Sequence, residues 1–222
     1  AAGAEFIVYT DPISLGVLEA PANYGATICV GDLHGLGLHL NFGGGQAGFI
    51  ASHDDMRYIT EFKELVDGMV ETTVPGEQGY SVVLIERTHY AMRENGKEFT
   101  GTQNNLWTAP VAVYLSLMGP KGMEEIGHTI MTNAKYAAKK LAGIPGVSLR
   151  FPSVFFKEFV VNFDKTGKTV EEINQLLLSR QIFGGVDLSR DYPELGQSAL
   201  YCVTETADKE SIDRLAGALQ AI

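Results

Sequence analysis

The stretch ATICVGDLHGLGLHLNFGGGQAGFIAS, residues 26–52, decides the fold class of this chain. It holds two short apolar runs, Ala26–Val30 and Gly48–Ser52, on either side of a glycine-rich loop with almost no charge. Runs of this length, bounded by Gly and Asp, predict strands. A third such run, Glu5–Tyr9, precedes them, and continuous apolar strands suit a sheet covered on both faces. The segment therefore predicts an α/β fold with a mixed or parallel sheet.

The composition excludes several kinds of partner. The 222 residues carry a formal charge of −10, and 45% of them are hydrophobic, as in globular chains. The sequence has no cluster of Lys and Arg, on which affinity for nucleic acid depends, so we expect no nucleic acid partner. Its apolar runs are shorter than the roughly 18 residues that cross a bilayer, so we expect no membrane association. Cys29 and Cys202 lie in apolar runs, which predicts buried thiols, a reducing compartment and a cytoplasmic location.

The middle of the chain mixes helices and strands. Residues 54–70 are predicted to be helical or irregular, and Tyr80–Glu86 is predicted to form a strand. Leu106–Met118 is apolar nearly all round, which is typical of a helix inside a large core. The pair Gly119–Pro120 ends that helix, and a second helix continues to Ala142 with acidic residues near its start and lysines near its end.

A different pattern follows the long helix and predicts a small α+β domain. Two strands, VSLRF and FFKEFVVNF, precede a helix over Val170–Ser179, a loop rich in Gly and Asp, the strand ALYCVTE and a final helix. Thr169 and Glu172 form the pattern of a capping box, which places the start of the first of these helices. The chain is thus predicted to hold two domains, residues 1–144 and 145–222.

Four segments carry a resemblance to a known family. They are DPISLGVLEAPANYGATICVGD, FGGGQAGFIA, AVYLSLMGPKGMEEIG and FFKEFVV together with the most specific part, GGVDLSRDYPELGQSALYCVTE at residues 184–205. Together they resemble the C-terminal half of subunit 1 in the glycine decarboxylase P-protein family, which belongs to the fold-type I enzymes that use pyridoxal phosphate (PLP). The resemblance implies a partial PLP-transferase-like large domain followed by a small α+β domain. Because the chain does not begin with Met and starts directly in a strand, we expect it to be a segment of a longer protein.

The resemblance also implies where PLP contacts lie. A PLP site needs a lysine amine, an acid opposite the pyridinium nitrogen and donors for the phosphate. By resemblance, Asp11, directly after the first strand, has the position of the acid, and His34 precedes the position of the lysine by one residue. No lysine precedes Lys63, however, so PLP is expected to be bound mainly by the partner, P-protein subunit 2.

Each of these positions also has a plain structural interpretation. Asp11 can simply cap the turn before the proline that follows it. His34 and His39 lack the close spacing and the neighbouring carboxylates or thiols of a metal site, so we expect no metal. The loop also contains three consecutive glycines, Gly43, Gly44 and Gly45. They either contact the cofactor and line a subunit interface or form only a permissive turn.

Cations follow the strand predicted at residues 80–86, in a polar segment whose plain structural interpretation is a solvated loop. By resemblance this segment lies near the active-site cleft, and Arg87, Arg93 and Lys97 are predicted to contact substrate or another anion, because their side chains suit carboxylate and phosphate. The family continues here into a Lys-Ala-Thr-Ser-Asn run, whereas this chain has NGKEFTGT at Asn95–Thr102. That departure leaves a divergent paralogue open.

The resemblance implies the reaction of the whole protein. With subunit 2, in an α2β2 assembly, it would decarboxylate glycine and pass an aminomethyl group to the lipoyl group of H-protein. This chain alone is expected to be inactive and to supply no catalytic residue. Two alternatives stay open, a subunit of a divergent PLP enzyme acting on another amino acid and a noncatalytic structural or regulatory subunit. Because a partial sheet exposes an edge, we also expect the chain alone to self-associate.

Overall fold

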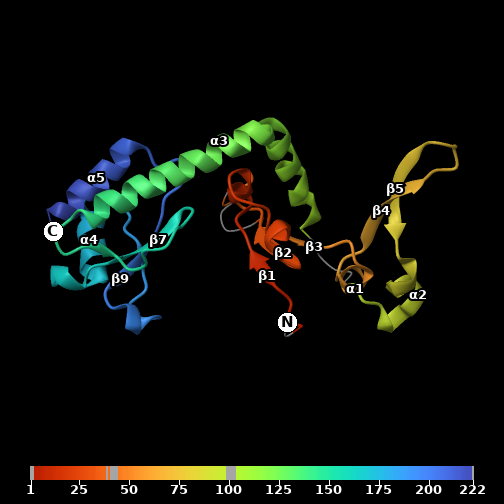
Figure 1. Ribbon diagram of the computed structural model, residues 1–222, viewed down its shortest axis with the longest axis horizontal. Helices are drawn as coiled ribbons and strands as arrows, with labels where there is room; N and C mark the ends of the chain where they lie inside the picture. Colours follow the sequence, from red (N-terminus) through yellow and green to blue (C-terminus); the bar gives the residue numbers. More distant parts are fainter. Residues whose placement is uncertain (1–2, 39, 41–44, 99–103, 222) are drawn as a thin grey trace. The chain divides into compact units, whose positions relative to one another are not determined.

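Figure 1 shows the computed structural model, which describes residues 3–38, 40, 45–98 and 104–221. The chain divides into two compact units, one of residues 1–12 and 18–117 and the other of residues 13–17 and 118–222. Both units combine strands with helices, as the α/β prediction requires. Most of the second unit begins at residue 118, before the domain boundary that the sequence predicts at residue 144. That boundary stays a prediction about the domains of the whole protein.

A three-stranded sheet organises the first unit. β1 (Ile7–Tyr9) pairs in parallel with β2 (Ile28–Asp32), and β2 pairs antiparallel with β3 (Gly48–Ser52). The strands form where the sequence predicts them, and the sheet is mixed. The expectation of a sheet covered on both faces is not met by the residues of this chain, because Ile7 and Tyr9 are 56% and 69% exposed.

A two-stranded hairpin follows the sheet. β4 (Val66–Glu71) pairs antiparallel with β5 (Gln78–Val83). The prediction that residues 54–70 are helical or irregular is therefore wrong at their end, and the helix α1 is confined to Met56–Ile59. β5 ends earlier than predicted because Leu84 adopts a left-handed φ of 56°, which breaks the extended backbone.

Short helical segments connect these strands and the later ones. The helix α2 covers His89–Met92. The 3-10 turns of the described residues are Pro12–Gly16, Pro21–Tyr24, Ile85–Arg87, Arg93–Asn95, Asn105–Trp107, Asp164–Thr166 and Pro193–Leu195. Several begin with proline, whose missing N–H costs nothing at the first helical position.

The longest helix, α3 (Thr108–Ala142), is interrupted at Gly119, where φ is 60° and ψ is −179°. The predicted separation of two helices at this glycine is therefore confirmed. The prediction that residues 106–118 lie inside a core is wrong for this chain, because Leu106 and Leu117 are 83% and 82% exposed and only Val111 of the segment is buried. Within the described ranges, no helix is both long and apolar enough to span a membrane.

The second unit combines an antiparallel sheet with helices. α4 (Val170–Ser179) and α5 (Lys209–Gln220) form here with the second half of α3. The sheet has the order β6-β7-β9-β8, whose strands are Ser148–Leu149, Glu158–Asn162, Ser198–Cys202 and Val186–Asp187. The predicted β-β-α-β-α order is confirmed, with the short strand β8 added in the loop rich in Gly and Asp.

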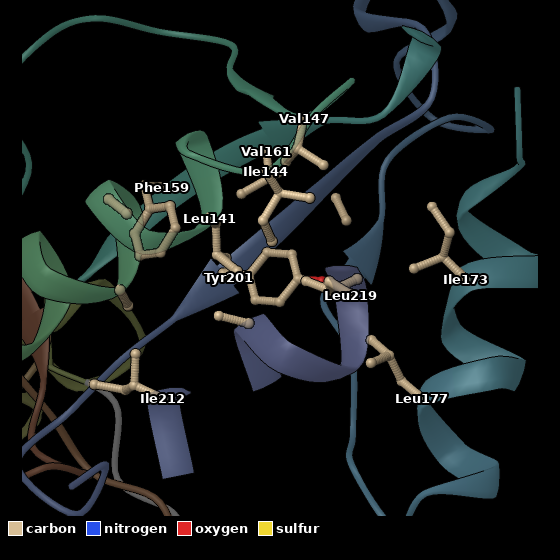
Figure 2. Close-up of a cluster of buried hydrophobic side chains, with 14 of the residues drawn as sticks. Leu141, Ile144, Val147, Phe159, Val161, Ile173, Leu177, Tyr201, Ile212 and Leu219 are labelled. Carbon is tan, nitrogen blue, oxygen red and sulfur yellow. The ribbon is translucent and has the colours of Figure 1, made fainter. Parts of the chain in front are cut away.

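One hydrophobic core holds the second unit together, as Figure 2 shows. Leu141 of α3, Val161 of β7 and Leu177 of α4 are completely removed from solvent. Ile212 and Leu219 of α5 complete the cluster. Since burying one such aliphatic side chain stabilises by about 1.5–3 kcal/mol, this core is the main source of stability in the unit.

The helix α4 begins at the predicted capping box. The N–H of Glu172 donates to Thr169 Oγ1 at 3.2 Å, and the N–H of Thr169 donates to Glu172 Oε2 at 2.8 Å. The hydrogen bond from the Thr169 N–H lowers the pKa of the Glu172 carboxyl. The predicted helix start is confirmed because both halves of the capping box are local in sequence.

A polar network holds the run DYPELGQS of the closing motif. Asp164 accepts hydrogen bonds from the N–H of Gln197 at 2.7 Å and from Asn162 Nδ2 at 2.9 Å, and these bonds lower the pKa of its carboxyl. Asn162 Nδ2 also lies 3.1 Å from the Leu195 carbonyl oxygen and 3.1 Å from Ser198 Oγ. The motif therefore fixes the turn before β9 onto β7.

The cysteines are less buried than predicted. Cys29 is partly exposed, Cys202 is exposed, and neither forms a disulfide. The prediction of a buried thiol is wrong for Cys202, which is the last residue of β9, where the alternation of side chains turns away from the core. Partial burial raises the pKa of the Cys29 thiol.

A charged network joins α3 to α5. Asp213 Oδ1 accepts a hydrogen bond from the Tyr136 hydroxyl at 2.7 Å and lies 2.9 Å from Lys140 Nζ. Asp213 Oδ2 accepts from Lys209 Nζ at 2.6 Å. The hydrogen bonds from Lys209, Tyr136 and Lys140 hold the pKa of the Asp213 carboxyl well below its usual range.

We expect Asp213→Asn to lower the melting temperature at neutral pH, because two lysines lose their shared carboxylate. The pKa of Asp213 is depressed in the folded state, so its stabilisation is present above the unfolded pKa of about 3.9 and is lost as the pH falls through the folded pKa. The difference in melting temperature between wild type and D213N should therefore shrink below about pH 4. Thermal unfolding by circular dichroism across this range measures it. Glu171→Gln, which breaks the exposed pair with Arg190, is the control, and a difference that stays constant with pH would contradict the expectation.

We expect substitution by alanine to have opposite effects on stability at two glycines of this unit. A Cβ at Gly185 would lie 2.7 Å from the Tyr201 ring and 2.9 Å from Ala199 Cβ, whereas a Cβ at Gly217 in α5 would meet nothing within 4 Å. Gly185→Ala should therefore destabilise by about 1–3 kcal/mol, as overpacking does. Gly217→Ala should stabilise by up to about 1 kcal/mol, because Ala is the better helix former. Urea unfolding of the two variants compares them, and equal free energies of unfolding would disprove the tight packing at Gly185.

Candidate functional site

The loop that follows β2 is held by Asp32. Its carboxylate accepts a hydrogen bond from the Tyr9 hydroxyl at 2.5 Å through Oδ2 and another from the N–H of His34 at 2.9 Å through Oδ1. Tyr9 is the last residue of β1 and Asp32 the last of β2, so the carboxylate joins the same ends of two parallel strands. One side chain thus ties the start of the loop to the sheet.

Glycines allow close packing at two places, one in β2 and one in the loop that follows it. A Cβ at Gly31 would lie 2.3 Å from the Thr10 carbonyl oxygen and 2.6 Å from the Phe49 ring, so only glycine fits between β1 and β3. Gly37 has a left-handed φ of 82° and lies against Tyr114. Glycine at these two positions is therefore a requirement of the backbone and not a sign of flexibility.

Apolar residues anchor the same loop. Leu36 and Leu38 are each 3% exposed. The N–H of Leu33 donates to the Ala47 carbonyl oxygen at 2.8 Å, which extends the pairing of β2 and β3 beyond the strands. The alternation of buried leucines with glycines explains the pattern of this part of the sequence.

A cavity of about 640 Å³ lies beside the loop. It is lined by Asp32, His34, Gln46, Ala47, Gly48 and Asn104. His34 Nε2 is buried and has no hydrogen-bond partner among the described residues. The lining offers a carboxylate, an imidazole and two amides, and the described residues that form it include no Lys or Arg.

His34 is the predicted PLP contact that the structure brings to this cavity. Asp11 is partly buried after β1 and is not among the described residues that line the cavity. Gly45 has a left-handed φ of 76°. Three residues considered from the sequence lie outside the described residues, namely His39, Gly43 and Gly44. The cofactor contacts predicted at Asp11 and at the glycines stay predictions.

Arg87 does not present its guanidinium to an open surface. The side chain is buried, and its Nε and Nη1 donate to the carbonyl oxygens of Thr60 and Glu64, each at 3.1 Å. Its Nη2 donates to the carbonyl oxygen of Phe62. The predicted anion contact at Arg87 gains no support from this arrangement, because the guanidinium satisfies the backbone between α1 and β4.

The other two predicted anion contacts have different surroundings. Lys97 pairs with the carboxylate of Glu61, and its hydrogen bond lowers the pKa of that carboxyl. Arg93 is exposed and adopts a left-handed φ of 51°. Neither lines the cavity beside Asp32 within the described part of the chain. The anion contacts of Arg93 and Lys97 therefore stay predictions, separate from that cavity.

A buried carboxylate stabilises the segment that departs from the family pattern. The Glu98 side chain is 0% exposed, and it accepts a hydrogen bond from the N–H of His89 and contacts His89 Nδ1. Burial opposes ionisation of Glu98, but the hydrogen bonds outweigh it, and the pKa of the carboxyl is lowered. Glu98 thus fixes the start of α2, while residues 99–102 of the departing stretch lie outside the described residues.

The cavity does not fit PLP by itself. PLP requires a lysine amine for covalent attachment and strong donors for a phosphate dianion. The described lining holds neither lysine nor arginine, and Asp32 places a carboxylate where a phosphate would be repelled. These residues therefore suit neutral or cationic groups.

Sequence reasoning missed Asp32, Gln46 and Asn104 as cavity residues. Asp32 carried a usable signal, because it is an acid at the end of a predicted strand and directly before a glycine-rich loop. No local signal joined Gln46 to Asn104, since they are distant in sequence and share a cavity only after folding.

Sequence comparisons place the chain among known proteins. The family model described as "Glycine cleavage system P-protein" matches residues 1–219. Proteins called "Probable glycine dehydrogenase (decarboxylating) subunit 1" from Desulfitobacterium hafniense and Thermococcus onnurineus are each 36% identical over 100% of this chain. The chain covers 48% of each, so it spans about half the length of the curated relatives that it matches.

Solved structures give the same result for the fold. A glycine decarboxylase (P-protein) of the glycine cleavage system, in inhibitor-bound form, matches 99% of this chain and 48% of its own with a TM-score of 0.87 and 32% identity. A NifS-like protein from Rickettsia africae covers 98% of this chain and 53% of its own, with a TM-score of 0.61 and 14% identity, and so shares the fold alone. The predicted fold class, that of the fold-type I PLP enzymes, is confirmed.

Asp32→Ala should loosen the loop, because the His34 N–H loses its acceptor. Hydrogen exchange of that amide should accelerate about five- to tenfold, as expected for a lost hydrogen bond of about 1 kcal/mol. Tyr9→Phe is the matched control, since it removes the hydrogen bond from the Tyr9 hydroxyl to Asp32 and leaves the acceptor of the His34 N–H in place. Exchange at His34 that is unchanged in D32A would show that Asp32 does not hold the loop.

Proposed function

Because the chain belongs to the glycine cleavage system P-protein family, we propose that it is the C-terminal half of subunit 1 of a glycine dehydrogenase (decarboxylating). The observation that carries this proposal is the match of 36% identity over the whole chain to relatives with that name. The agreement of the fold with a P-protein over 99% of the chain supports it. On this proposal the whole protein acts on glycine.

We infer that this chain shapes the site and that a partner subunit binds PLP. The absence of Lys and Arg from the described lining of the loop cavity supports this division. When bound, PLP supplies the electron sink that decarboxylation of an amino acid needs. Asp32 and Tyr9 would hold the loop in place, and His34, Gln46 and Asn104 would offer hydrogen-bonding groups to a molecule in the cavity.

The partner is proposed to be P-protein subunit 2 in an α2β2 assembly, and the aminomethyl group is proposed to go to the lipoyl group of H-protein. Relatives named as subunit 1 support a second subunit. Open apolar surfaces on β1 and the first half of α3, such as Tyr9 and Leu117, suit coverage by further protein. The cytoplasmic location and the self-association of this chain alone stay predictions.

A second candidate function is a subunit of a divergent PLP enzyme that acts on another amino acid. It is favoured by the stretch Asn95–Thr102, which replaces a run that the family keeps near its active-site cleft. In this chain the stretch contributes the buried Glu98, which stabilises α2 instead of offering a ligand contact.

Co-purification of the full-length parent with a candidate subunit 2 tests both functions. We expect the complex to show the absorbance of bound PLP, and subunit 1 alone to show none. Exchange of label between bicarbonate and glycine, with lipoylated H-protein present, should require both subunits. Subunit 2 with its PLP lysine replaced is the control and should abolish the exchange.

The outcomes separate the candidates. A complex that binds PLP and decarboxylates another amino acid, without exchange on glycine, would favour the divergent enzyme. PLP bound by subunit 1 alone would contradict the proposed division of roles. Normal turnover by subunit 2 alone would favour a noncatalytic structural or regulatory role for this subunit.

A further inference from the structure

The C-terminal unit contains a cavity of its own, with a volume of about 630 Å³. Its walls come from the end of β9, from α5 and from the segment Gln181–Gly185, which joins α4 to β8. A mainly apolar cavity of this size with a few polar groups is typical of small-molecule sites. Nothing in the proposed function uses it.

Hydrogen bonds hold the segment Gln181–Gly185, one wall of the cavity, in place. Arg214 Nη2 donates to the carbonyl oxygen of Gln181 at 3.1 Å, and Asn174 Nδ2 donates to the carbonyl oxygen of Gly185 at 2.9 Å. Gln181 adopts a left-handed φ of 59°, which costs about 1 kcal/mol or more and persists only where the surroundings enforce it. Side chains of α4 and α5 therefore hold the wall at both ends.

Two glycines let this wall lie close to its neighbours. A Cβ at Gly185 would strike the Tyr201 ring, and one at Gly184 would strike Asn174 Oδ1, so this backbone lies against its neighbours without side chains of its own. The next wall residue, Phe183, is 89% exposed. A ligand in the cavity would cover this aromatic ring, and removing it from water is favourable.

Two side chains of opposite charge line the cavity. They are Glu158 on β7 and Arg214 on α5, and neither is in an ion pair with any residue that the structure describes. A carboxylate and a guanidinium suit the ammonium and the carboxylate of one zwitterion. Apolar side chains that line the same cavity include Ile182, Ile212 and Leu215. A nucleotide fits poorly, because its several negative charges would meet one guanidinium and one carboxylate.

We propose that this cavity binds an α-amino acid with an apolar side chain. The ligand carboxylate pairs with Arg214, and the ligand ammonium pairs with Glu158. The ligand side chain lies against Ile182, Ile212 and Leu215. The site is independent of the proposed function, because none of these residues lines the loop cavity.

Cys202 provides the readout, because it lines this cavity and is exposed. The probe is leucine, and the measurement is the rate of Cys202 alkylation by iodoacetamide in a Cys29→Ser background, followed by mass spectrometry. Ligand binding reduces the fraction of protein with an empty cavity by the factor 1 + [L]/Kd. Leucine at about ten times its Kd should therefore slow alkylation about tenfold. 3-Methylbutylamine and 4-methylpentanoate, which each lack one charged group of leucine, should bind at least about tenfold more weakly.

Variants test the two charges. Arg214→Gln removes the charge but keeps an N–H donor for the Gln181 carbonyl, and Glu158→Gln keeps the shape of the side chain. Each should weaken protection by leucine about tenfold or more, which is the loss expected for a charge-assisted hydrogen bond. The matched controls are Glu171→Gln and Arg190→Gln, an exposed pair that does not line this cavity, and they should leave protection unchanged. Melting temperatures close to wild type confirm that R214Q and E158Q are folded.

Several results would overturn the proposal. They are no protection of Cys202 by millimolar leucine, equal protection by the amine and the acid, and full protection in folded R214Q or E158Q. The same assay on the full-length parent should give the same protection. Failure of Cys202 to react there without leucine would show that the cavity is covered in the whole protein, which also overturns the site. None of these outcomes bears on glycine decarboxylation.

Discussion

Burial of one face of α3 against the antiparallel sheet is the interaction on which the C-terminal unit depends. Leu141 and Val161 leave water only when β7, β9, α4 and α5 close over the helix (Figure 2). The polar features follow from that closure: the carboxylate of Asp213 ties α5 to α3, and Asp164 fixes the turn that leads into β9. The wall of the second cavity rests on the same core through Tyr201, whose burial raises the pKa of its hydroxyl to about 12.

The loop site depends on how charge is distributed in the first unit. Asp32 brings the one carboxylate of the described cavity lining, and it is satisfied by Tyr9 and by the backbone of His34. The guanidinium of Arg87 donates hydrogen bonds to backbone carbonyl oxygens. Leaving a buried polar group unpaired costs about 1–3 kcal/mol, so moving the Arg87 guanidinium from these carbonyls to a ligand would be unfavourable. The described lining can therefore form a polar cavity, but it contains no cationic group that could pair with a phosphate.

Features that depend on neighbouring residues could be predicted from the sequence, whereas the burial of individual side chains could not. The capping box at Thr169 and the break at Gly119 involve residues close together in sequence, so the structure confirmed both. The hairpin strand β4 was missed because its alternation of apolar and polar residues includes a glycine and two acids. The burial expected for Leu106–Met118 and for Cys202 was wrong because apolar character alone does not say which surface covers a side chain.

The sequence by itself determined the α/β class, most strand and helix positions, the resemblance to a family and the lack of a lysine before Lys63, because these depend on residue type and local order. Only the tertiary structure decided that Asp32 and Asn104 line one cavity and that Arg87 serves the backbone. It also decided that Glu158 and Arg214 line a second cavity. Those features depend on hydrogen bonds and burial between residues that are distant in sequence, and folding alone brings such residues together.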